Sequence, residues 1–586
     1  MKKLKKHSIL SVLLAIAICA TMIVPMFAVG VAAEPIAMTA DTAWYADDKK
    51  ITDENGTSWY VISDADDLAG LASIVDAGTD DFKDDYIKLG GDITFNEGSA
   101  SDWANENNLP VYLWEPIGST AYPFRGTFDG NHNTISGIYM NETSDTDTAL
   151  FSILDNATVQ NVKIENSYFA SATNRLAALV GRTMSSSNEQ NIINNCHIGS
   201  NVYVVNTVKT NGVAGIVASV GLSSVVDTST TISNCSSSAT ISGLNRVGAM
   251  VGQIQNAGSL SISNCVNNGT VTATSTSSTD MMAGGMIGYL ISCTNAVTIT
   301  NCTNTGTISS QKNAGGAVGY NAAEATVNIS GFLNTGDIDS GAANNVGEVI
   351  GGLYGTASVS NSVALGSTKG NAGQGLFVGY AGATAAFTFS DSYAVDDGTR
   401  NVIRSANASY QGDYVENAVE NGYAIQISTY DGASIRMSSD TSSTGIRFIT
   451  QIINKDIITA LEEQGYTVSI GTLVALGKDI TDASAFETAT TVDVEATVGA
   501  WFTKNVPDAT ATYFAGSVNE IPAAQYTTDL SAIGYITLTK DGTSATCYSA
   551  AYVTRNIAEI AEAAYNDTNG GYSTEELAIL ANFFGS

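Results

Sequence analysis

Short stretches in which apolar and polar residues alternate recur through the middle of the chain, and each closes in the same way. The clearest copy is residues 298–302, Thr-Ile-Thr-Asn-Cys, where an alternating strand ends in Asn-Cys. Eight copies, some with a substitute for the cysteine, close at Val162, Cys196, Cys235, Cys265, Cys302, Phe332, Ser362 and Ser392. Successive closing positions are 34, 39, 30, 37, 30, 30 and 30 residues apart. A base period of 30 residues with insertions predicts a stacked repeat architecture.

Two further short sequence phrases recur with the same period as the first. One is a pair of glycines around apolar residues, as in residues 284–288 (Gly-Gly-Met-Ile-Gly) and 315–319 (Gly-Gly-Ala-Val-Gly). The other follows the cysteine position, as in Asn-Thr-Gly at 304–306 and again at 334–336. Asn and Gly tolerate positive φ, so these phrases indicate turns. Each repeat therefore holds roughly three short β-segments separated by turns.

One such unit cannot bury its apolar side alone, whereas stacked copies can, in parallel ladders spaced ~4.8 Å apart. The sequence therefore predicts a mainly β fold, with a parallel β-helix over residues 146–400. The crossover rule makes right-handed coiling the expectation. A β-sandwich array is the alternative, although a sandwich would not need every copy to keep the same internal order of strands.

The cysteines at the closing position are expected to point inward, one above another. Parallel side-chain vectors hold the Cβ atoms beyond the ~3.8 Å that a disulfide prefers, so a column of buried thiols is favoured over a set of bridges. Val162, Phe332 and Ser362 occupy the same position, which indicates packing. No CxxC pair or nearby histidine supports zinc, and we predict neither a metal nor a cofactor.

Residues 34–145 are expected to form an N-terminal cap and the first coils. Ser63 and Asp66 resemble a capping box, followed by an amphipathic helix that would cover the open end of the solenoid. Trp103, Trp114 and Tyr122 lie in an insertion before the first coil. These aromatic rings are ligand-binding candidates because they could stack on sugars; the alternative is that they cover the cap.

The period stops near residue 400. We predict a linker at 401–420 and a separate α+β domain at 421–586, with helical patterns at 457–464, 554–565 and 573–584. Arg436 and Arg447 stand out in so acidic a chain as further ligand-binding candidates. A guanidinium group can hold a carboxylate or a sugar hydroxyl, and pairing with local acids is the alternative.

Residues 1–33 are typical of a secretory signal, with four early lysines, an apolar stretch at 9–24 and small residues before Glu34. An uncleaved membrane anchor is the alternative. We expect an extracellular or cell-surface product without membrane insertion after cleavage.

The amino-acid composition argues against some classes of partner and of chemistry. Only 14% of the 586 residues are charged, and the formal net charge of −32 argues against nucleic acid as a partner. Three histidines make histidine-dependent chemistry improbable. Asp337 and Asp339 are the one close carboxylate pair in the coils, roughly 7 Å apart along a strand. A retaining glycosidase could use such a pair, but solvated acids are the favoured interpretation, and no catalytic residue is predicted.

A family resemblance emerges from these repeats. Residues 124–140, FRGTFDGNHNTISGIYM, look like the opening segment of GLUG-repeat proteins, and residues 284–288 look like the GLUG motif. The resemblance spans roughly 60–395 and implies an adhesin-like surface protein of gut bacteria with a β-helix, but no particular ligand. Residues 421–586 resemble an uncharacterised C-terminal module of clostridial extracellular proteins, through 432–436 and 444–448.

We expect a non-catalytic surface rod whose Ser/Thr/Asn-rich faces engage a glycan or a host or bacterial surface protein. A polysaccharide-degrading β-helix enzyme, either a lyase or a glycoside hydrolase, and a structural spacer that presents residues 421–586 are the alternatives. Three or more converging acids in a groove, or acids with Arg or Lys, would favour the enzyme. A uniform face of small polar residues would favour binding.

Overall fold

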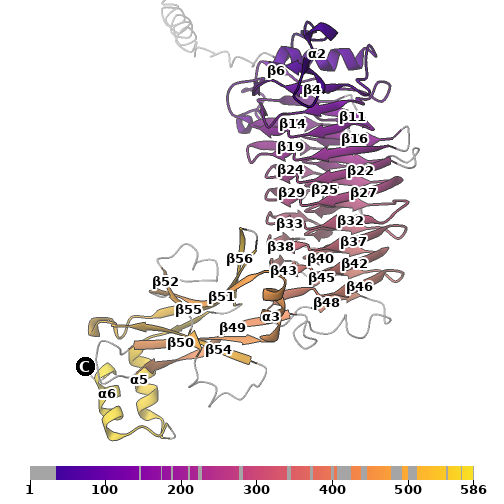
Figure 1. The fold of residues 1–586 in the computed structure, drawn as a ribbon. Coiled ribbons are helices and arrows are strands. Elements are labelled where there is room, and N and C mark those ends of the chain that lie inside the picture. The colour runs from indigo at the N-terminus through magenta and orange to yellow at the C-terminus, as the bar shows by residue number, and fades with distance from the viewer. Residues whose placement is uncertain are drawn as a thin grey trace, which may run out of the picture.

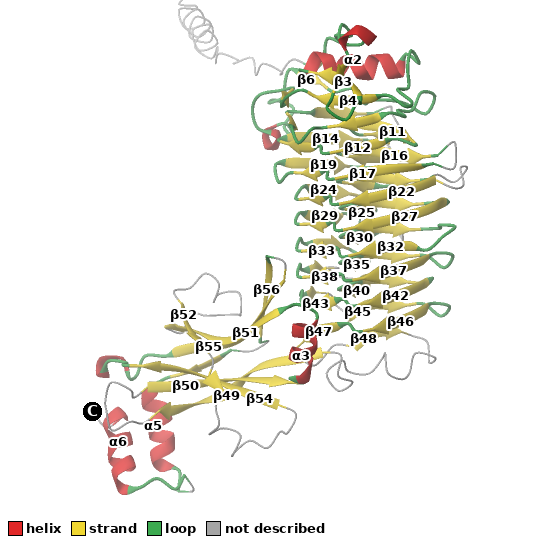
Figure 2. Ribbon diagram, viewed as in Figure 1, coloured by secondary structure: helices red, strands yellow, loops and turns green. Residues whose placement is uncertain are grey.

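The computed structural model describes residues 34–584 except 144–146, 173, 186–188, 209–210, 222–227, 276–280, 340–344, 370–373, 397–400, 406–423, 437–444, 477–490, 496, 499–510, 541, 550–551 and 569. The predicted signal at 1–33 and most of the predicted linker lie outside these residues. The described chain is mainly β and forms a parallel solenoid of about 10 turns, followed by a smaller α+β domain (Figures 1 and 2). The predicted fold class is confirmed.

Between residues 127 and 381, each coil of the solenoid visits four parallel sheets in the same order. The first sheet contains β3 (Ser58–Ile62), β4 (Tyr86–Leu89), β7 (Thr127–Asp129), β12 (Thr158–Gln160), β17 (Gln190–Asn194), β22 (Thr228–Ser233), β27 (Ala257–Ser263), β32 (Val297–Thr300), β37 (Thr326–Ser330), β42 (Thr356–Ser360) and β46 (Ala386–Ser390). The second contains β5 (Ile93–Thr94), β8 (Thr134–Ser136), β13 (Lys163–Glu165), β18 (His197–Ile198), β23 (Ser236–Ser237), β28 (Val266–Asn267), β33 (Thr303–Asn304), β38 (Leu333–Asn334), β43 (Val363–Ala364) and β47 (Tyr393–Asp396).

The third and fourth sheets complete the coil. The third contains β9 (Tyr139–Glu142), β14 (Ser167–Ser171), β19 (Val202–Asn206), β24 (Thr240–Gly243), β29 (Thr270–Ala273), β34 (Ile308–Ser310), β39 (Ile338–Asp339) and β44 (Thr368–Lys369). The fourth sheet has two columns of strands. The first column contains β10 (Asp147–Thr148), β15 (Arg175–Ala177), β20 (Val213–Ala214), β25 (Arg246–Gly248), β30 (Met282–Gly284), β35 (Asn313–Gly315) and β40 (Asn345–Gly347). The second column contains β11 (Phe151–Asp155), β16 (Val180–Met184), β21 (Val217–Val220), β26 (Val251–Ile254), β31 (Ile287–Leu290), β36 (Val318–Asn321) and β41 (Ile350–Leu353). The long strand β45 (Gln374–Ala381) joins both columns, and β48 (Asn401–Ser405), in the predicted linker, pairs with it.

The residue before each closing position explains the repeated phrase. Asn161, Asn195, Asn234, Asn264, Asn301, Gly331, Asn361 and Asp391 all have φ between 46° and 64°. This left-handed conformation turns the chain from the first sheet to the second, and Asn, Asp and Gly reach it at the lowest cost. The closing residues, from Val162 to Ser392, are then all buried in one inward column, as predicted. The cysteines among them are free thiols.

The glycine phrases form the corner between the two columns of the fourth sheet. A Cβ on Gly284 would lie 2.0 Å from the carbonyl oxygen of Ile287, so no larger residue fits there. Gly248, Gly284, Gly315 and Gly347 stack in register on successive coils. The phrase therefore marks a place where two backbones approach closely.

Helix α2 (Ala65–Asp76) covers the N-terminal end of the solenoid. Its N-cap is Asp64, whose side chain accepts a hydrogen bond from the Asp67 N–H. The Asp67 carboxylate accepts from the Ser63 N–H in return. The capping box predicted at Ser63 and Asp66 is thus wrong by one residue, because Asp64 caps the helix and Asp67 satisfies the backbone N–H of Ser63.

The C-terminal domain continues the second sheet. Strand β49 (Ala424–Arg436) pairs in parallel with β47 and then antiparallel with β50 (Gly445–Ile453), which pairs with β54 (Ala511–Asn519). A second antiparallel sheet contains β52 (Thr491–Glu495), β51 (Thr467–Leu476), β55 (Leu530–Lys540), β56 (Thr543–Tyr548) and β57 (Val553–Arg555). The helices are α3 (Asp456–Glu463), α5 (Ile557–Asn566) and α6 (Thr574–Phe584).

The domain also packs against the outer surface of the second sheet. Outward positions there are polar in the early coils, such as Lys163 and His197, and apart from Val266 they stay polar until Leu333 and Val363 in the late coils. These two side chains are buried in one apolar cluster with Ile536 and other residues of the domain. The change from polar to apolar on one row of positions therefore marks where the domain docks.

Candidate functional site

The outer surface of the first sheet carries the most regular array of polar side chains on the solenoid. Two rows of outward positions run over nine coils and contain only two residues that are not neutral and polar, Ile192 and Asp129. We call these two rows the hydroxyl face. Its residues are Thr127, Thr158, Ile192, Thr231, Ser261, Thr298, Asn328, Ser358 and Thr388 in one row, and Asp129, Gln160, Asn194, Ser233, Ser263, Thr300, Ser330, Ser360 and Ser390 in the other.

The hydroxyl face has the periodicity of the solenoid. Neighbouring coils are ~4.8 Å apart, so nine coils span about 38 Å, and the two rows lie ~7 Å apart along each strand. Inward residues such as Ile262 and Ile299 alternate with the face and are buried, which fixes the direction of every outward side chain. The array is thus held by the core of the rod.

Hydrogen bonds within the hydroxyl face are unevenly distributed. Near the N-terminal end, Gln160 Nε2 donates to Asp129 Oδ2 at 2.8 Å, and Ser233 Oγ donates to Asn194 Oδ1 at 2.9 Å. In the middle coils, the hydroxyls of Ser261 and Thr298 make no hydrogen bond to any described residue. Their donors and acceptors face solvent and are open to a ligand.

A row of tyrosines lies on the fourth sheet and was not anticipated from the sequence. Tyr289, Tyr320, Tyr354 and Tyr380 are half-buried, with successive ring centroids 5.3, 5.0 and 5.9 Å apart. The Arg246 guanidinium lies 4.9 Å from the Tyr289 centroid. Because Tyr320 and Tyr354 stack on one another, their faces are already occupied and this row is a poor platform for sugar rings. The available signal was a tyrosine at the same strand position in three coils, at 289, 320 and 380; in the coil between the last two, Gly352 holds this position and the tyrosine comes two residues later.

The enzyme alternative predicts acids beside basic residues in a groove, and the fourth sheet holds one such group. Asp147 contacts Arg175 and lies 3.3 Å from Arg182, while the Asp147 and Arg182 side chains are only 2% and 3% exposed. Burial lowers the pKa of Arg182. The single Asp147 carboxylate pairs with both guanidinium groups, and all three side chains are buried and do not line an open groove.

The other candidates for chemistry are also engaged with neighbours. Lys369 Nζ is 4.0 Å from Asp337 Oδ2, and the Ser367 hydroxyl donates to Asp337. His197 contacts Ser236 and Asn195 through its two ring nitrogens, and burial lowers the pKa of the imidazole. In the described part of the chain, no cluster of three or more His, Cys, Asp or Glu side chains is placed to hold a metal ion.

The three aromatic candidates of the N-terminal cap lie in different environments. Trp103 is 4% exposed and Trp114 is 3% exposed, whereas Tyr122 is 46% exposed and covers Gly78. Each tryptophan lines a separate cavity, of about 490 Å³ at Trp103 and about 370 Å³ at Trp114. Both rings therefore help to cover the cap, and each keeps an edge toward a cavity.

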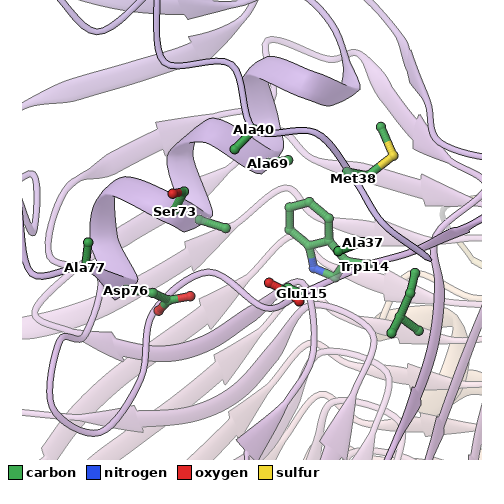
Figure 3. A pocket seen from close by; sticks show the side chains of 11 residues that line it. Ala37, Met38, Ala40, Ala69, Ser73, Asp76, Ala77, Trp114 and Glu115 are labelled. Carbon is green, nitrogen blue, oxygen red and sulfur yellow. The ribbon is translucent and has the colours of Figure 1, made fainter. Parts of the chain in front are cut away.

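Figure 3 shows the cavity at Trp114, between α2 and the strands β1 (Ile36–Ala37) and β6 (Tyr112–Leu113). Small side chains of α2, such as Ala69 and Ser73, leave this space open. Asp76 and Glu115 add two carboxylates to its lining, with Glu115 beside Trp114. Trp114 Nε1 is occupied, because it donates to the Leu150 carbonyl at 3.4 Å.

The two arginine candidates lie on neighbouring antiparallel strands of the C-terminal domain. Arg447 in β50 is opposite Ser434, and Arg436 in β49 is opposite Gly445. Arg447 is half-buried and has interactions of its own. The Arg436 side chain lies outside the described part of the structure. The two residues are thus brought near each other by strand register, and their ligand-binding role stays a prediction.

Comparisons with known proteins add no constraint on this site. The chain matches no protein-family model, no curated protein and no solved structure. The resemblance to GLUG-repeat proteins therefore remains a prediction from the motifs. Among the described residues, no helix is both long and apolar enough to cross a membrane.

Proposed function

We propose that the protein is an exported, non-catalytic surface protein whose solenoid is a rod that binds an extended glycan along the hydroxyl face. The observation that carries this proposal is the run of neutral hydroxyl and amide side chains over nine coils. A polymer with many hydroxyls can make the same weak hydrogen bond repeatedly along such a face. Each net bond contributes only ~0.5–1.5 kcal/mol, so affinity arises from repetition.

The composition of the face favours a glycan over a protein partner. Protein interfaces have an apolar core enriched in aromatic side chains. The hydroxyl face has a single apolar member, Ile192, and no aromatic ring. Sugar hydroxyls match its donors and acceptors without requiring an apolar centre. The net charge of −32 further favours a neutral or basic glycan over an acidic one.

Export rests on the pattern of residues 1–33, and the adhesin-like role on the resemblance to GLUG-repeat proteins. Both are consistent with free hydroxyls displayed on a long surface. The enzyme alternative would need an open group of acids, and the ion pairs around Asp147 are buried.

A glycan array probed with residues 34–586 tests the proposal. The informative variant is Ser261→Arg with Thr298→Arg, because these residues are paired on β27 and β32 in the middle of the face. The matched control is Thr272→Arg with Ser309→Arg, a pair on the third sheet of the same two coils. We expect the first variant to lose at least tenfold in glycan binding and the control to bind as the parent does.

Two results would overturn the proposal. If the hydroxyl-face variant binds every glycan as the parent does, the rod is a spacer or binds elsewhere. If the parent releases reducing or unsaturated sugar ends from a bound polysaccharide, the protein is an enzyme.

A further inference from the structure

The insertion between β5 and β7 lines an open cavity that the hydroxyl face does not use. Its volume of about 490 Å³ lies within the ~300–1,000 Å³ typical of small-molecule sites. Leu109, Val111 and Tyr112 give it an apolar wall, while Glu97 and Asp102 add two exposed carboxylates. Asn96 fixes this shape, because its amide bonds both the N–H and the C=O of Tyr112 and also the Gly137 carbonyl.

Trp103 presents a hydrogen-bond donor to this cavity. Its ring is only 4% exposed and packs edge-on against Tyr139, with centroids 6.2 Å apart. The indole Nε1–H donates to no described residue. A Cβ on Gly98, which lines the same cavity, would lie 3.8 Å from this nitrogen. The ring is held by packing, whereas this N–H is open to the cavity and can donate to a ligand there.

The charges around the cavity specify the ligand further. Neither Glu97 nor Asp102 forms an ion pair with a described residue, and no lysine or arginine lines the cavity. Two uncompensated carboxylates in a chain of net charge −32 attract a cation and repel an acidic sugar. A hydroxylated ligand that also carries a positive charge would satisfy both the indole donor and the carboxylates.

We propose that this cavity binds the terminal residue of a glycan when that residue is an amino sugar with a protonated amine. Trp103 Nε1 donates to a sugar hydroxyl, Tyr112 and Val111 contact the apolar ring face, and Glu97 and Asp102 accept from the ammonium group. The proposal deepens the proposed function, since it rests on the protein being a glycan-binding protein. The hydroxyl face would then hold the polymer and the cavity its end.

Calorimetric titration of residues 34–586 with a glucosamine tetrasaccharide tests the assignment. The N-acetylated tetrasaccharide and a galacturonate tetrasaccharide are the neutral and acidic comparison probes. We expect the glucosamine oligomer to bind at least tenfold tighter than either. Glu97→Gln with Asp102→Asn should remove that preference, and Trp103→Phe should weaken binding of the glucosamine oligomer about tenfold while keeping the ring packed against Tyr139.

The control is Asp76→Asn with Glu115→Gln, which removes the same charge from the cavity at Trp114 and should leave binding unchanged. Equal binding of all three oligomers, or an unchanged preference in the Glu97/Asp102 variant, would overturn the cavity proposal. Loss of glycan-array binding in the Ser261/Thr298 variant with intact tetrasaccharide binding would separate the two surfaces. Failure of the cavity variants alone would leave the hydroxyl face standing.

Discussion

Glu348 Oε2 accepts a hydrogen bond from the backbone N–H of Gly366 at 2.7 Å, deep inside the rod. The same oxygen lies 3.3 Å from the donor Asn334 Nδ2. Asn334 ends an internal asparagine ladder, in which Asn267 donates to Asn304 and Asn304 donates to Asn334, at 2.7 and 2.8 Å. Ala364 occupies the next ladder position, so the Glu348 carboxylate takes the place of the missing amide.

The ladder predicts a compensating pair of substitutions. Small residues face the ladder in other coils, and a Cβ on Gly316 would lie 2.8 Å from Asn334 Oδ1. Glu348→Gly alone should cost about 1–3 kcal/mol, because the Gly366 N–H loses its acceptor and Asn334 Nδ2 keeps only the Gly336 carbonyl. Adding Ala364→Asn should restore most of that loss by extending the ladder one coil.

Urea unfolding followed by circular dichroism measures this pair. Ala364→Asn alone is the control and should also destabilise, since its side chain competes with Glu348 for one space. A double variant no more stable than the Glu348→Gly single variant would show that Glu348 has another role.

The left-handed turns give a second prediction. Asn301 has φ of 52°, and Gly331 holds the equivalent position one coil later with φ of 64°. Asn301→Gly should therefore be nearly neutral, whereas Asn301→Val should cost roughly 1–2 kcal/mol because a β-branched residue resists this conformation. Unfolding midpoints of the two variants provide the measurement, and equal midpoints would contradict the turn assignment.

The sulfur column makes stability depend on pH. Burial raises the pKa of the Cys235 thiol well above its usual range. The unfolded thiol ionises near pH ~8.5, so its stabilising contribution is complete below that pH and is lost as pH rises toward the folded pKa. The loss per buried thiol is at most ~1.4 kcal/mol per pH unit.

Melting temperatures between pH 7 and 9.5 test this dependence. Cys235→Val should reduce the fall of the melting temperature with rising pH. Ile232→Val, which removes a buried methylene and no thiol, should leave that fall unchanged. An identical decline in the parent and in Cys235→Val would show that Cys235 does not contribute.

The sequence predicts the coil itself and misses features that depend on contacts between particular side chains. The repeat that closes at positions such as Cys265 and Cys302 predicts the coil, because every copy must bury the same side and must turn at a residue that tolerates positive φ. The cavity at Trp103 has no such signal, since the insertion is held by single contacts like that of Asn96 with Tyr112. The role of Glu348 could likewise not be predicted, because its contact with Gly366 depends on the register between neighbouring coils.

The docking of the C-terminal domain gives the last prediction. Val363 points outward from the second sheet yet is fully buried against the domain, whereas Thr303, two coils earlier on the same row, is half-exposed. Val363→Asp would bury an unpaired carboxylate and should cost roughly 3–5 kcal/mol, enough to undock the domain. Limited proteolysis should then cut between the solenoid and residue 424, while Thr303→Asp should be cut as slowly as the parent. Equal protection of Val363→Asp and the parent would mean that pairing of β47 with β49 holds the domain without the apolar contact.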